Sequence, residues 1–107
     1  MYAHVTNLES ELGPVKNGDL GVELAVGGTV APTAYTGTYA THFWVAVKTK
    51  AVLVTFDGTD PATATQVGVQ LAVGYEKVWS KRMVECARFI EQAGGQAGVV
   101  RLEPLAE

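Results

Sequence analysis

The residues that could bind a metal ion or act as nucleophiles are few and far apart. The only two histidines are His4 and His42, and no His-x-His or His-x-x-x-His pair is present. A catalytic zinc ion usually takes three protein ligands, so two isolated histidines do not predict a zinc site. Cys86 is the single cysteine, which excludes a disulfide within the chain. Its apolar sequence neighbours predict a small buried side chain rather than a nucleophile.

The carboxylates and hydroxyls show no catalytic spacing either. Asp57 and Asp60 enclose a Gly-Thr pair, which does not match the alternating oxygen ligands of an EF-hand, and Pro61 favours a tight turn. Folding could bring Asp57, Asp60 or Glu76 together as the carboxylate pair of a glycoside hydrolase, although nothing in their spacing singles them out. Neither serine lies in a Gly-x-Ser-x-Gly motif. We therefore predict a protein that is not an enzyme and that binds no cofactor and no metal.

Composition and charge narrow the class of protein further. The 107 residues suit one domain, and the abundance of valine, threonine and glycine favours strands and turns. The net charge of −3 argues against nucleic-acid binding, which depends on neutralising phosphates with Lys and Arg. No stretch approaches the ~18 apolar residues of a membrane span, and the N-terminus lacks the basic start of a signal peptide. We expect synthesis in the cytoplasm, with neither nucleic acid nor membrane as a partner.

Short alternating runs predict the strands that would position any functional side chain. Alternation of apolar and polar residues is clearest in residues 42–48 and 51–56, and turn residues follow at 57–61. Weaker alternation marks residues 66–71, and a further short strand is expected at 75–79. About six to eight such strands in one domain favour an all-β fold, an antiparallel β-sandwich or jelly roll.

Residues 80–93 are compatible with two structures. Ser80 could cap a helix in which Val84, Ala87 and Ile90 lie at helical spacing. Alternatively, residues 87–91 and 98–102 could form a hairpin around the intervening glycines. We favour the hairpin, because strands spaced 8–12 residues apart fill the rest of the chain.

The N-terminal third lacks the regular alternation of the later segments. Residues 1–40 are predicted to form an extended, irregular arm or loop with short strands, and residues 41–107 the sandwich core. The Thr- and Tyr-rich stretch 29–41 could lie along a neighbouring subunit, or form an ordinary long loop with one edge strand.

Three aromatic residues are candidates for a partner interface: Tyr35, Tyr39 and Trp44. Aromatic side chains are enriched at binding hot spots. Trp44 points away from the Phe43 face of its strand. We expect the second sheet of the sandwich to cover it, or otherwise a ligand or partner.

Two segments resemble small structural proteins of tailed-bacteriophage virions. They are residues 41–47, THFWVAV, and residues 51–61, AVLVTFDGTDP. Residues 87–90 and 99–103 fit the same pattern, in which a Val-Thr-Phe-Asp-Gly strand and turn precede a Gly-rich hairpin and a C-terminal strand. The resemblance covers about residues 41–103. It implies a β-sandwich or jelly roll assembled on a capsid or tail, and it brings no catalytic residues.

We therefore predict a structural virion protein, made in the host cytoplasm and located on the capsid surface. As a decoration or cement protein it would bind the major capsid protein and copies of itself, and so stabilise the phage head. A tail, neck or fibre component is the alternative within the virion. A non-viral sugar-binding β-sandwich, stacking sugars on Tyr35, Tyr39, Trp44 and Trp79, is the alternative outside it.

Overall fold

The structure is a computed structural model that describes residues 13–14, 20–33, 35 and 37–106. The residues 1–12 and 15–19 of the predicted N-terminal arm lie outside this description. The secondary-structure elements are β1 (Gly13–Pro14), β2 (Val22–Val26), β3 (Ala31–Pro32), β4 (His42–Lys48), β5 (Val52–Thr55), β6 (Val69–Leu71), β7 (Glu76–Ser80), α2 (Lys81–Cys86), β8 (Arg88–Glu91) and β9 (Gly98–Ala106).

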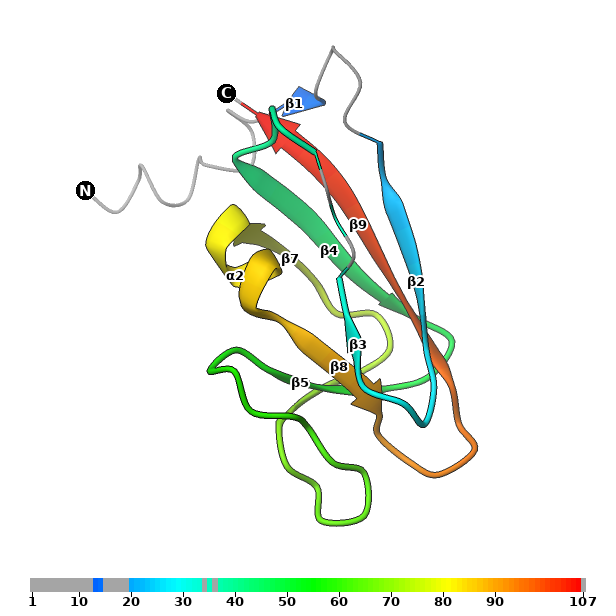
Figure 1. Cartoon of the computed structure of the whole chain (residues 1–107). Helices are drawn as coiled ribbons and strands as arrows, with labels where there is room; N and C mark the ends of the chain where they lie inside the picture. The colour runs from blue at the N-terminus through cyan, green and yellow to red at the C-terminus, as the bar shows by residue number, and fades with distance from the viewer. Residues whose placement is uncertain (1–12, 15–19, 34, 36, 107) are drawn as a thin grey trace, which may run out of the picture.

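Two antiparallel sheets pack face to face, which confirms the predicted all-β sandwich (Figure 1). The five-stranded sheet has the order β1-β9-β4-β7, with β2 also paired to β9, and the four-stranded sheet has the order β3-β8-β5-β6. In Figure 1, β9 crosses the molecule between β4 and β2. The short strands β2 and β3, which lie within residues 1–40, therefore each add to the edge of a different sheet.

The core lies between the sheets and follows the predicted alternation of β4. Phe43, Val45 and Val47 are buried, and they face Val52 and Val54 of β5 across the sandwich. The largest buried side chain is that of Trp79. Burial of such apolar side chains stabilises the fold by roughly 1.5–3 kcal/mol each. The remaining members of the cluster are Val26, Ala40, Leu71, Val84, Ala87, Phe89, Val100 and Leu102.

The outer face of the four-stranded sheet is also partly covered. Leu53 is 1% exposed and is paired in register with the buried Ile90, on the face opposite Val54. Residues 61–66 lie over this face and are tied to the end of β8, because the Thr63 hydroxyl donates to the Glu91 carbonyl oxygen at 2.7 Å. Both faces of β5 are therefore buried.

Residues 80–93 contain both a helix and a strand. Ser80 caps α2, its hydroxyl accepting the Met83 N–H at 3.2 Å, as the helical alternative predicted. Strands then form at 88–91 and 98–106, but the predicted hairpin is wrong because these strands do not pair. β8 joins β5 and β3, whereas β9 joins β1, β2 and β4 in the other sheet. Within the described residues, no helix has the length and apolar character needed to cross a membrane.

Candidate docking surface

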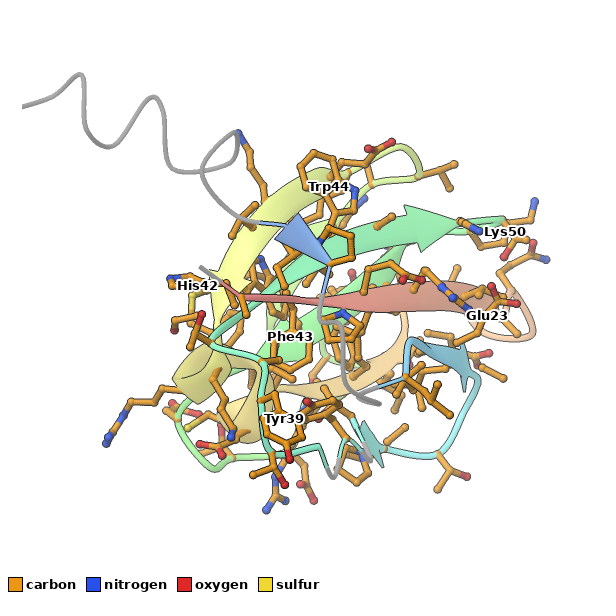
Figure 2. The ribbon with its side chains drawn as sticks, turned by 90° about the horizontal axis from the view of Figure 1, so that it is seen from above. Glu23, Tyr39, His42, Phe43, Trp44 and Lys50 are labelled. Carbon is orange, nitrogen blue, oxygen red and sulfur yellow. The ribbon has the colours of Figure 1, made fainter. Side chains whose placement is uncertain are left out.

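The three candidate aromatic residues do not form one patch. Tyr35 is half-buried, and its ring packs edge-on against Phe43 with centroids 4.4 Å apart. Tyr39 is 58% exposed. Figure 2 shows Tyr39 and Trp44 on opposite sides of the ribbon, with Phe43 between them. Trp44 and Tyr39 therefore belong to different surfaces, and Tyr35 contributes to packing within the protein.

Trp44 lies on the outer face of the five-stranded sheet, and the expectation that the second sheet covers it is wrong. The second sheet packs on the Phe43 face of β4, one residue out of phase with Trp44. Trp44 is half-buried in register between Val78 of β7 and Glu103 of β9. Its backbone is thus held on both sides by neighbouring strands, which fixes the direction in which the side chain leaves the sheet.

Charged residues lie beside the indole on the same face. Ala46, two residues along β4, is in register with Arg101, and the Arg101 guanidinium pairs with the Glu103 carboxylate. Glu23 of β2 extends this network, with Oε2 3.9 Å from Arg101 Nη1 and 3.7 Å from Lys48 Nζ. Exposed ion pairs add little stability, but they give the surface a fixed charge pattern. We call the surface formed by Trp44, Ala46, Val78, Arg101 and Glu103 the Trp44 face.

The aspartates considered for catalysis have structural partners. The Asp57 carboxylate accepts the Thr59 hydroxyl at 2.6 Å and the Thr59 N–H at 3.1 Å. These bonds, the hydroxyl first, lower the pKa of Asp57 from its ordinary value. Asp60 pairs with Arg88 at 2.7 Å, and Glu76 lies on β7 in the other sheet. Both aspartates thus form structural contacts near the turn after β5.

Metal ligands are not clustered either. Among the described residues, no group of three or more His, Cys, Asp or Glu side chains could hold a metal ion. His4 lies outside the described residues, and His42 Nδ1 lies 3.0 Å from the Thr41 hydroxyl. Cys86 is exposed, so its predicted burial is wrong. Val84 takes the inward position of α2, and Cys86, about 200° further round the helix, faces away.

A depression lies on the outer face of the four-stranded sheet, where residues 61–66 meet residues 90–94. Its volume is about 750 Å³. The Gln66 amide donates to the carbonyl oxygens of Thr63 and Gln92 and accepts from the Gln92 amide, at 2.7–3.0 Å. The Glu91 carboxylate accepts the Gly95 N–H at 3.1 Å. These side chains hold the loop against the sheet.

Sequence reasoning missed the exposed edge of β6. Val69 of β6 is 58% exposed, and Val67 and Val73, which flank the strand, are 42% and 54% exposed. One signal was available, since residues 61–75 contain no charged side chain, whereas exposed sheet edges usually carry charges or proline. No family model, curated protein or solved structure matches the chain.

Proposed function

We propose that the protein is a structural component of a phage virion, a decoration or cement protein that binds the major capsid protein through the Trp44 face. The observation that carries the proposal is a half-buried tryptophan on the outer face of the five-stranded sheet, beside the Arg101–Glu103 ion pair. Interface hot spots are enriched in Trp and Arg, and their central apolar groups are surrounded by a polar rim. This is the arrangement that the Trp44 face offers.

Preorganisation supports the same proposal. Binding costs conformational entropy when side chains or loops must be ordered, and less when a sheet already holds them in place. Trp44 lies on a central strand, with β7 on one side and β9 on the other. The charged pairs beside it would give orientation and partner selectivity more than affinity.

The resemblance to tailed-phage structural proteins supports this partner. Residues 41–47 contain Trp44, and residues 51–61 form β5 and the turn after it. On a shell of identical subunits, many modest contacts add up to strong retention. A place in the tail, neck or fibre remains the alternative. The sugar-binding alternative has less support, because Trp79 is 2% exposed and the other aromatic residues do not line up on one surface.

The composition of purified particles tests the proposed place in the virion. We expect quantitative mass spectrometry of gradient-purified phage from the source culture to find this chain in copies comparable to the major shell subunit. Copy numbers comparable to a tail or neck ring would support the alternative location. Absence of the chain from intact particles would contradict a structural virion role.

Substitution of Trp44 tests the docking surface. We expect Trp44→Ala to weaken binding to capsids that lack the protein by about 30-fold, since a hot-spot residue contributes ~2 kcal/mol or more. The measurement is co-sedimentation of purified protein with such capsids over a concentration series. Met83→Ala, which shortens an exposed side chain on α2, is the matched control and should change binding less than threefold. Unchanged binding by Trp44→Ala would refute docking through the Trp44 face, and a loss of binding by Tyr39→Ala alone would place the interface on the other surface.

A further inference from the structure

We infer that two copies of this chain pair through the exposed edge of β6, antiparallel to one another and centred on Gln70. The first observation is that this edge lacks the features that normally prevent such pairing. Outer strands of a sheet usually carry a charge or a proline that opposes pairing with another chain. Of the outermost strands that the structure describes, β6 alone has neither. The other outermost strands carry Pro14 (β1), Glu23 (β2), Pro32 (β3), and Glu76 with Lys77 (β7).

The second observation is the exposure of apolar side chains at this edge. Val69 is in register with Val54 and therefore lies on the core face of the sheet. Val54 is completely buried, yet Val69 is 58% exposed, so the sandwich is open beside β6. A groove of about 320 Å³ runs here, lined in part by Phe56, Val67 and Val69. Covering apolar surface of this kind with a partner removes it from water, which favours binding.

The sequence of the edge identifies the partner as a second copy. Residues 69–71 of β6 read Val-Gln-Leu, with one apolar side chain on each side of Gln70. A two-fold axis through Gln70 would place Val69 opposite Leu71 of the second copy, and Leu71 opposite its Val69. The Gln70 amides of the two copies would face each other on the other side of the sheet. Such self-complementarity is what a two-fold interface requires.

Charge does not oppose this pairing. Like charges directly opposite one another destabilise antiparallel strands, and residues 61–75 contain no charged side chain. On the same side of the sandwich, by contrast, the edge strand β7 carries Glu76 and Lys77, both exposed. The four-stranded sheet is therefore the one suited to extension, and pairing would join two such sheets into one.

β6 has three residues, so the pair is expected to be weak in solution and to strengthen where copies are held close together. The inference does not depend on the proposed function, because it concerns the isolated chain. We expect sedimentation equilibrium to show a monomer–dimer equilibrium at protein concentrations up to about 1 mM. A dissociation constant of about 1 mM corresponds to a binding free energy of about −4 kcal/mol. A monomer throughout this range would overturn the inference, whatever the composition of phage particles.

Two variants locate the interface. Val69→Lys should weaken the dimer at least tenfold, whereas Leu20→Lys adds the same charge at a residue that is 78% exposed elsewhere and should not. In a Cys86→Ser background, Gln70→Cys should form a disulfide-linked dimer under mild oxidation, because the Cα atoms of opposite residues lie about 4.5–5.5 Å apart, a separation that a disulfide spans. Thr65→Cys, in the exposed loop before β6, is the control and should stay largely monomeric. A dimer that tolerates Val69→Lys, or that Gln70→Cys does not cross-link, would contradict pairing through β6.

Discussion

Replacing Trp79 with alanine is expected to lower the free energy of unfolding by about 3–5 kcal/mol. The Trp79 ring stacks parallel to Phe89 with centroids 6.1 Å apart and meets Phe56 edge-on at 5.1 Å. Its Nε1–H donates to the Tyr75 hydroxyl at 2.9 Å. The substitution would leave a large cavity and remove this hydrogen bond, in a domain whose total stability is expected to be about 5–15 kcal/mol.

Urea unfolding followed by circular dichroism measures this effect without relying on tryptophan fluorescence. The matched control is Trp44→Ala, the same change at the half-exposed indole on the outer face. It should cost less than about 1.5 kcal/mol, since only part of the ring is removed from water. Equal losses for the two variants would mean that Trp79 does not occupy the core position described.

The second large effect is expected from Gly98→Ala. A Cβ atom at Gly98 would lie 2.5 Å from the Lys50 carbonyl oxygen and 2.8 Å from Val52 Cγ1. The backbone around Lys50 passes over Gly98 where the chain leaves β4 for the other sheet, so one of these segments would have to move. Overpacking typically costs 1–3 kcal/mol, and a clash with backbone should approach the upper end, about 3 kcal/mol.

Thermal and urea unfolding of Gly98→Ala would test this packing. Gly94→Ala provides the control, because a Cβ atom there meets nothing within 4 Å. We expect this variant to stay within about 0.5 kcal/mol of the parent protein, as most surface substitutions do. If the Gly98 variant is as stable as the Gly94 variant, the close approach of Lys50 to β9 is incorrect.

The local alternation of apolar and polar residues was sufficient to predict the central strands. Alternation in residues 42–48 identified the buried face of β4 and placed Trp44 on the opposite one. Alternation in residues 51–56 found β5, but it gave no sign that Leu53, on the face opposite Val54, is buried as well. That side chain is 1% exposed and lies in register with Ile90, a neighbour from a strand that is distant in the sequence.

The predictions that failed involve pairing between distant segments. Residues 87–91 and 98–102 each have the composition of a strand, and only the competing partners β5 and β4 separate them into different sheets. The same holds for the aromatic candidates. Composition marked Tyr35 as a potential contact, but its ring packs on Phe43. The edge of β6 was visible in the sequence as an uncharged stretch, although its exposure could be established only in three dimensions.

The position of β9 in the five-stranded sheet has a consequence for biosynthesis. Among the strands that the structure describes, β2 pairs only with β9, and about 70 residues separate the end of β2 from the start of β9. At a translation rate of about 5–20 residues per second, β2 waits roughly 4–14 s for its partner to be made. β4 can pair with β7 during this interval, but β2 has no strand to join. The nascent chain therefore completes its larger sheet in a late step, when β9 enters between β2 and β4.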